Sequence, residues 1–124
     1  MKRLNVLLID DEEDYVTTLA ERLCFRGIPC RVALSGRQAL LSVESLPPDV
    51  MVLDFKMPDL DGLAVLKKIK QKHKHIEIVI VSAFLDAQLE EDLKQAGAYA
   101  CLSKPVHLES LVDLISSAAT MKQR

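Results

Sequence analysis

The chain has 124 residues, 49% of them hydrophobic and 27% charged, and its formal net charge is −2. This length suits a single domain spanning residues 1–124, and the apolar fraction is sufficient for a packed core. The charge balance argues against direct nucleic-acid binding, and no apolar run approaches the roughly 20 residues that cross a bilayer. Because the first apolar stretch ends at Asp10 and is too short for a signal peptide, we expect a cytoplasmic protein without membrane contact.

Cysteine usage agrees with that compartment. Cys24, Cys30 and Cys101 are an odd number and form no C-x-x-C pair. We therefore predict buried free thiols in a reducing compartment, and neither a disulfide framework nor a zinc site.

The first predicted element is a strand over Val6–Ile9, which is apolar at every position. Such a run is typical of a strand that is buried on both faces in a parallel sheet. Five consecutive acidic residues follow from Asp10, and the dipole of a helix favours acids in its first turn. The predicted helix ends near Gly27, and its apolar face consists of Val16, Leu19 and Leu23.

A second strand is predicted over residues 30–34, followed by a second helix. The strand sequence alternates only in part, which places it at an edge of the sheet. Ser35 and Gln38 have the spacing of a capping box, so the helix begins after Ser35, and Pro47-Pro48 ends it.

The third predicted strand, residues 50–53, leads four apolar residues directly into Asp54. Open parallel sheets bind their ligands at the carboxyl ends of the strands, so Asp54 is a candidate nucleophile or metal ligand. The structural alternative is that Asp54 only caps the next turn, since Pro58 and Gly62 mark a loop there. Asp61 is expected to cap a third helix.

The fourth and fifth predicted strands also end in polar side chains. Residues 78–81 lead into Ser82, and residues 99–102 lead towards Lys104. Both strands therefore add a candidate functional group to the edge of the sheet that holds Asp54.

Strand and helix thus alternate five times. Asp86 and Gly97 are expected to bound the fourth helix, and the last helix runs from near Leu108 towards Met121. Parallel strands joined by helical crossovers form a doubly wound, flavodoxin-like (βα)5 fold of the α/β class with three layers. We predict a parallel five-stranded sheet of order 2-1-3-4-5, with the partly polar second strand at an edge.

This topology gathers Asp10, Asp11, Asp54, Ser82 and Lys104 at one edge of the sheet. Three crowded carboxylates repel one another, and oxygen ligands with room for water suit Mg²⁺, which would keep Asp54 ionised. An ionised carboxylate beside a metal can attack phosphorus, and Ser82 and Lys104 could then hold the phosphoryl oxygens. Taken singly, the acids could merely begin a helix, the serine could be a turn residue and the lysine a surface charge.

With these residues the chain resembles the receiver domain of two-component response regulators, from Val6 to the last helix. The resemblance rests on the order and spacing of short motifs: Asp10-Asp11, Asp54, Met57-Pro58, Asp61-Gly62, Ser82-Ala83 and Lys104-Pro105. It implies that Asp54 accepts a phosphoryl group. It also implies that Mg²⁺ is bound by Asp10, Asp11, Asp54 and the backbone carbonyl of Lys56. The Lys104–Pro105 peptide bond is expected to be cis, which would aim Lys104 into the site.

The resemblance also implies partners. The phosphodonor would be a sensor histidine kinase, a histidine phosphotransfer domain or a small phosphodonor. An output domain or partner protein would be controlled through the face formed by the fourth helix, the fifth strand and the fifth helix, and a homodimer is a further possibility. Such a domain is not an enzyme, apart from weak self-catalysed phosphorylation and dephosphorylation.

One position departs from the family pattern. Receiver domains usually carry an aromatic residue three positions before the strand-five lysine, and it turns inward together with the switch residue, here Ser82. This chain has Cys101 at that position. Tyr99 would share the Cys101 face of an unbroken strand, at a distance of about 6–7 Å. We therefore expect weaker coupling between Ser82 and the output face.

Three other functions remain open at this point. A Mg²⁺-dependent phosphohydrolase of the haloacid-dehalogenase type needs a second Asp two residues after the first, where this chain has Lys56. A flavodoxin-like cofactor binder needs a phosphate loop after the first strand, where five acids would repel phosphate. A non-phosphorylated pseudo-receiver would not need the complete set of acids, hydroxyl and lysine. The basic residues 67–75 fit a solvated helix end better than a nucleic-acid patch.

Overall fold

A computed structural model describes residues 4–122. Five parallel strands alternate with five helices, and the sheet has the order β2-β1-β3-β4-β5, as predicted. The strands are β1 (Val6–Ile9), β2 (Cys30–Ala33), β3 (Val50–Asp54), β4 (Glu77–Ser82) and β5 (Ala100–Ser103). The helices are α1 (Glu13–Phe25), α2 (Gly36–Ser45), α3 (Gly62–Lys72), α4 (Ala87–Gln95) and α5 (Leu108–Lys122).

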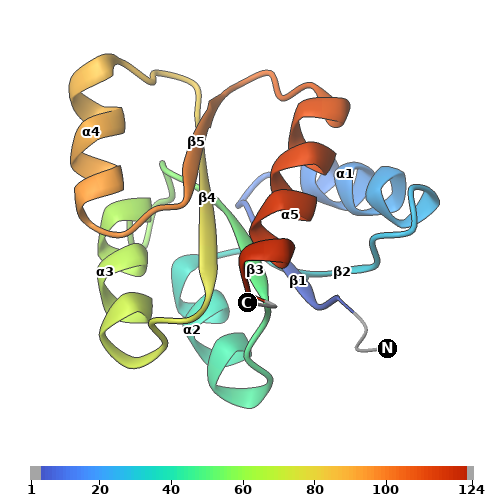
Figure 1. The fold of residues 1–124 in the computed structure, drawn as a ribbon, viewed down its shortest axis with the longest axis horizontal. Helices are drawn as coiled ribbons and strands as arrows, with labels where there is room; N and C mark the ends of the chain where they lie inside the picture. Colours follow the sequence, from blue (N-terminus) through green and yellow to red (C-terminus); the bar gives the residue numbers. More distant parts are fainter. Residues whose placement is uncertain (1–3, 123–124) are drawn as a thin grey trace.

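The sheet lies between two layers of helices. Figure 1 shows α1 and α5 on one side of the sheet, and α2, α3 and α4 on the other. Each side has its own core: Leu23 and Leu111 belong to the core under α1 and α5, and Leu66 and Leu93 to the core under the other three helices. The fold is therefore a three-layer sandwich of the predicted kind.

Burial of the strands follows the predicted pattern. All residues of β1 and β3 are buried, and β4 is buried from Ile78 onwards. In β2 only Ala33 is buried, and Val32 is 38% exposed. The two helix layers cover both faces of the central strands, whereas β2 has a neighbouring strand on one side only.

Helix caps fix where the connecting loops end. The side chains of Ser35, Asp61 and Asp86 each accept a hydrogen bond from the backbone N–H three residues later, at 2.8 to 3.1 Å. The second half of the predicted capping box is wrong, because Gln38 Oε1 accepts from the N–H of Leu34 at 2.9 Å. The glutamine side chain reaches past Ser35 to the end of the preceding strand.

A further cap comes from a distant residue. Asp59, in the loop after β3, accepts hydrogen bonds from the N–H groups of Gly36 at 3.0 Å and Arg37 at 2.9 Å. These donors belong to the first turn of α2, where backbone N–H groups lack partners within the helix. The hydrogen bond from Arg37 is the main reason why the pKa of Asp59 lies below its ordinary value. The loop is thereby tied to α2.

Two predictions about side-chain placement are wrong. Tyr99 does not share the face of Cys101: it packs against the core under α1 and α5, whereas Cys101 packs against the opposite core. The reason is that β5 begins at Ala100, so strand alternation does not extend to Tyr99. None of the three cysteines is fully buried, contrary to the prediction: Cys30 and Cys101 are half-buried, and Cys24 is exposed because it follows the buried Leu23 on α1 and lies outside the buried stripe. All three cysteines are free, as predicted.

Within residues 4–122, no helix combines the length and the apolar character that crossing a membrane requires.

Gly62 lies directly against the backbone that follows Asp54. Its N–H donates to the carbonyl of Phe55 at 2.6 Å, and a Cβ at this position would lie 2.8 Å from Phe55 Cα and 3.2 Å from the carbonyl oxygen of Asp54. Real Cβ atoms do not approach backbone atoms so closely. Any side chain at position 62 must therefore displace the loop that carries the candidate site.

We expect Gly62→Ala to lower the free energy of unfolding by about 1–3 kcal/mol, through overpacking, and to shift the amide signal of Phe55. Gly27→Ala is the matched control, because Gly27 has a φ of 81° and no neighbour within 4 Å. This substitution should cost about 1–2 kcal/mol through backbone strain and leave the amide signal of Phe55 unchanged. Urea denaturation and amide spectra measure both effects. An unchanged Phe55 signal in Gly62→Ala would contradict the close approach.

Candidate functional site at the carboxyl edge of the sheet

Three carboxylates meet at the ends of β1 and β3. Ile9 is paired with Leu53 in the register of these neighbouring strands, so the residues that follow, Asp10 and Asp54, lie side by side. Asp10 and Asp54 are buried, Asp11 is exposed, and the three offer carboxylate oxygens that all lie within 4.8 Å of one another. Oxygen donors at this spacing, with one side open to water, fit a hard divalent cation such as Mg²⁺.

The position of Asp54 raises the pKa of its carboxyl group. Burial is the largest effect and the charge of Asp10 the next, and together they raise the pKa of Asp54 from 3.8 to about 6. Lys104 opposes this shift through its charge and a hydrogen bond, and Asp11 adds a smaller increase. The ionised form is therefore disfavoured in the metal-free site, although it prevails above pH 6.

Lys104 is the cation that faces this cluster. Its Nζ donates to Asp10 Oδ2 at 3.0 Å and lies 3.4 Å from Asp54 Oδ1 and 3.5 Å from the exposed Glu12 Oε1. Burial opposes its charge, but the hydrogen bond and charge of Asp10 and the charge of Asp54 outweigh burial and hold the pKa of Lys104 above its ordinary value. The Lys104–Pro105 peptide bond is cis, which is the geometry that the resemblance implied.

Ser82 ends β4 and is linked to β5 through its backbone. Its carbonyl oxygen accepts a hydrogen bond from the N–H of Lys104 at 2.9 Å, and its hydroxyl accepts from the N–H of Phe84 at 3.2 Å. Ser82 is 5% exposed. The hydroxyl and the lysine thus come from neighbouring strand ends that are joined by a hydrogen bond.

The loops after β3 and β4 contribute Lys56 and Phe84. Both residues are exposed, and Lys56 Nζ lies 5.6 Å from the centroid of the Phe84 ring, within the range of a cation–π contact. Ligation of a metal by the backbone carbonyl of Lys56 stays a prediction.

Tyr15 is a residue of this site that the sequence did not reveal. It lies in the first turns of α1, and Lys104 Nζ is 5.0 Å from the centroid of its ring. Burial raises the pKa of Tyr15, the charge of Lys104 lowers it, and Asp10, Asp54 and Glu12 raise it further. One signal could have pointed to it, since Tyr15 precedes Leu19 of the predicted apolar face by four residues, and thus by one helical turn.

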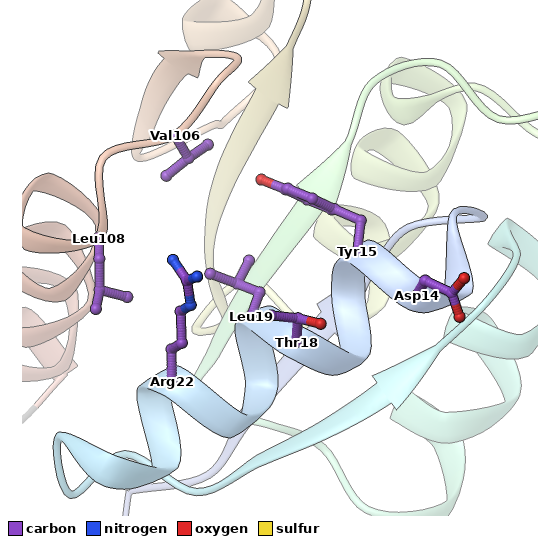
Figure 2. A pocket seen from close by; sticks show the side chains of 7 residues that line it. All are labelled: Asp14, Tyr15, Thr18, Leu19, Arg22, Val106 and Leu108. Atoms are coloured by element: carbon purple, nitrogen blue, oxygen red, sulfur yellow. The ribbon is translucent and has the colours of Figure 1, made fainter.

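A groove of about 450 Å³ lies beside Tyr15. It lies between α1 and the segment that joins β5 to α5, and Figure 2 shows the ring of Tyr15 reaching from α1 towards Val106. Tyr15, Leu19 and Val106 also line a small cavity that reaches Asp10 and Asp54. The complete lining of the groove is Asp14, Tyr15, Thr18, Leu19, Arg22, Val106 and Leu108.

The chain matches the family described as the response regulator receiver domain over residues 6–116. The DNA-binding transcriptional regulator NtrC of Salmonella typhimurium is 33% identical over 123 residues, which cover 99% of this chain and 26% of NtrC. The sporulation initiation phosphotransferase F of Bacillus subtilis is 28% identical over 122 residues, which cover 98% of this chain and 98% of that protein. The chain thus spans about a quarter of NtrC and nearly all of the second relative.

Solved structures show the same architecture. A response regulator receiver domain protein from Clostridium thermocellum has a TM-score of 0.91 and 28% identity, with 97% of each chain covered. The receiver domain of NtrX from Brucella abortus has a TM-score of 0.85 and 28% identity, covering 93% of this chain and 98% of that one.

The pKa of Asp54 leads to a prediction about stability. Because its folded-state pKa of about 6 exceeds the ordinary value of 3.8, the protonated acid stabilises the fold, and this stability is lost as the pH rises through 6. Each pKa unit corresponds to about 1.4 kcal/mol, and solvent at the open side screens part of it. In metal-free buffer at pH 7.5, we therefore expect Asp54→Asn to be more stable than the wild type by about 1–2 kcal/mol.

Asp59→Asn is the matched control, and its expected change in stability has the opposite sign. The pKa of Asp59 is lowered, chiefly by the hydrogen bond from Arg37, so its ionised form stabilises the fold above its ordinary pKa and that stability is lost as the pH falls. Asp59→Asn should therefore be less stable than the wild type at pH 7.5. Urea denaturation at pH 4 and pH 7.5 measures both variants. A loss of stability in Asp54→Asn at pH 7.5 would refute the unfavourable ionisation of Asp54 in the metal-free site.

Proposed function

This chain belongs to the family of response regulator receiver domains, and on that premise we propose that it is a phosphorylation-dependent signalling switch with Asp54 as phosphoacceptor. The observation that carries the proposal is the buried carboxylate of Asp54, which lies within a cluster with Asp10 and Asp11 and 3.4 Å from the ammonium of Lys104. This set provides a nucleophile, ligands for a cation, and a positive charge for the transferred group.

The proposed reaction is a displacement at phosphorus. A carboxylate oxygen of Asp54 forms the new P–O bond while the P–N bond of a donor phosphohistidine breaks, and the bonding electron pair leaves with the imidazole nitrogen. Mg²⁺ bound to Asp10, Asp11, Asp54 and the carbonyl of Lys56 would neutralise charge on the carboxylates and the phosphoryl oxygens. Lys104 and the hydroxyl of Ser82 would bind the remaining phosphoryl oxygens.

The competing enzymatic function lacks a key group. A phosphohydrolase that uses a strand-end Asp needs an acid two residues later, and here Lys56 occupies that position, with its ammonium over the ring of Phe84. We therefore propose that the chain acts as a phosphoacceptor with at most weak self-catalysed turnover, and not as an enzyme.

The proposed partners follow from the family. A sensor histidine kinase or histidine phosphotransfer domain in the cytoplasm would supply the phosphoryl group, and the face of α4, β5 and α5 would control an output domain, a partner protein or a homodimer. NtrC, of which this chain matches about a quarter, is a DNA-binding regulator. Because this chain matches only about a quarter of that regulator, we propose that the output lies in a separate domain or protein and that this chain does not itself contact nucleic acid.

Phosphorylation of Asp54 can be measured directly. With Mg²⁺ and acetyl phosphate, we expect one phosphoryl group per chain, stable in acid and labile in base, because an acyl phosphate is the product of attack by a carboxylate. Asp54→Asn should lose it, while the control Asp59→Asn should retain it. Intact-mass spectrometry and peptide mapping give the answer, and persistent labelling of Asp54→Asn would remove Asp54 from its proposed role.

Cation binding provides a second test. Mg²⁺ should shift the amide signals of Asp11 and Asp54 in a titration. Asp11→Ala should weaken the affinity at least about tenfold, since the loss even of a supporting contact typically costs 10–100-fold. Asp14→Ala removes the same charge from a neighbouring acid outside the carboxylate cluster, and should have little effect. Equal affinities in the two variants would place the cation elsewhere.

Cys101 leads to a prediction about the switch. In the proposed active state Ser82 moves inward, and a thiol fills the vacated space less completely than the aromatic ring usual in the family, which leaves unfilled apolar volume. We expect Cys101→Tyr to enlarge the response of α4 to a beryllofluoride mimic of the phosphoryl group. Cys24→Tyr, the same change at an exposed position, is the control. Amide shifts report the response, and equal α4 shifts in all three proteins would contradict a role for the missing aromatic.

A further inference from the structure

The ammonium of Lys104 has one uncharged partner among the side-chain contacts that the structure describes. That partner is Tyr15, whose ring centroid lies 5.0 Å from Lys104 Nζ. A cation within about 6 Å of a tyrosine ring centroid is attracted to the negative face of the ring. The other described partners are the carboxylates of Asp10, Glu12 and Asp54.

The contacts of Lys104 with these carboxylates would change or weaken during phosphoryl transfer. When Asp54 becomes an acyl phosphate, the negative charge near Lys104 moves from the carboxylate to the phosphoryl oxygens, and a bound cation would compete with Lys104 for Asp10. Glu12 is 68% exposed, and a pair of this kind is screened by water. The ring of Tyr15 keeps its attraction throughout, because neither the metal nor the phosphoryl group changes its charge.

Tyr15 has a fixed place on α1. Its ring is half-buried and projects from α1 beside the buried Val16, and it forms a common wall of the groove and of the small cavity at Asp10 and Asp54. Figure 2 shows it projecting from α1 in the direction of Val106. Lys104 is likewise half-buried, but its long side chain has more rotatable bonds and it follows the exposed Ser103. A helix-bound ring can restrict such a side chain at little entropic cost of its own.

We propose that Tyr15 is a positioning residue: its ring face holds the ammonium of Lys104 over Asp54 before and during phosphoryl transfer. The proposal rests on the proposed function, since it assigns Tyr15 a part in loading Asp54. The contact itself is independent of that function, and it can be observed in the metal-free protein.

The contact is tested by NMR without metal or phosphodonor. An ammonium over a ring face brings the Cε protons of Lys104 into the shielding region of the ring, so their signals should lie upfield of those of the other lysines. They are identified by their loss in Lys104→Met. We expect the upfield shift to persist in Tyr15→Phe and to disappear in Tyr15→Leu.

The positioning role is tested by the initial rate of Asp54 labelling with acetyl phosphate at saturating Mg²⁺. Loss of a cation–π contact should slow Tyr15→Leu about five- to thirty-fold, and Tyr15→Phe should restore the rate to within about twofold. Leu19→Ala is the control for packing, because Leu19 lines the same groove and cavity without a described contact to Lys104. If Tyr15→Leu does not fold, 3,5-difluorophenylalanine at position 15 keeps the shape but weakens the ring face, and it should label more slowly than Tyr15→Phe.

The outcomes separate this inference from the proposed function. Lys104 signals without an upfield shift in the wild type would overturn the contact. Wild-type labelling rates in Tyr15→Leu, or an equal loss of rate in Leu19→Ala, would overturn the positioning role even if the contact exists. A wild-type protein that is never labelled at Asp54 would refute the proposed function, while the shift of the Lys104 signals still decides the contact.

Discussion

The unfavourable ionisation of Asp54, which is buried and lies beside the carboxylate of Asp10, is the constraint on which the rest of the site depends. Neighbouring parallel strands place these two buried carboxylates side by side, and burial together with the charge of Asp10 raises the pKa of Asp54 to about 6. The fold could relieve this cost by protonation, but a protonated acid is no nucleophile. Lys104 offers partial relief, since it contacts both acids at 3.0 and 3.4 Å. A divalent cation would supply the remainder, which makes the site both costly to fold and ready to bind a metal.

Contacts to backbone groups hold the surrounding loops in place. The N–H of Lys104 donates to Ser82, Gly62 lies against Phe55, and Asp59 caps α2. Each contact joins two segments that meet at the carboxyl edge of the sheet, so the functional side chains depend on loops that are fixed at both ends. A change at one strand end, such as phosphorylation of Asp54, would therefore be passed to its neighbours and not absorbed by a mobile loop.

Much of this arrangement could be predicted from the sequence, because it rests on local signals. Apolar runs define strands buried on both faces, polar side chains at helix starts define caps, and the topology then brings Asp10, Asp54 and Lys104 together. The failures have physical reasons. Asp59 caps a helix that begins 23 residues earlier in the chain, which no local pattern can indicate. The face of Tyr99 depended on where β5 begins, and the contact of Tyr15 with Lys104 depends on how α1 packs beside the sheet.

The proposed chemistry of the site depends on how Asp54 titrates. Carbon-13 NMR of its side-chain carboxyl group, measured in the metal-free protein as a function of pH, reports this directly. We predict a pKa of Asp54 near 6, a higher value in Lys104→Met because a stabilising cation is lost, and a lower value when Mg²⁺ is added. A pKa at or below the ordinary value of 3.8, or one that does not respond to Lys104→Met, would contradict this prediction.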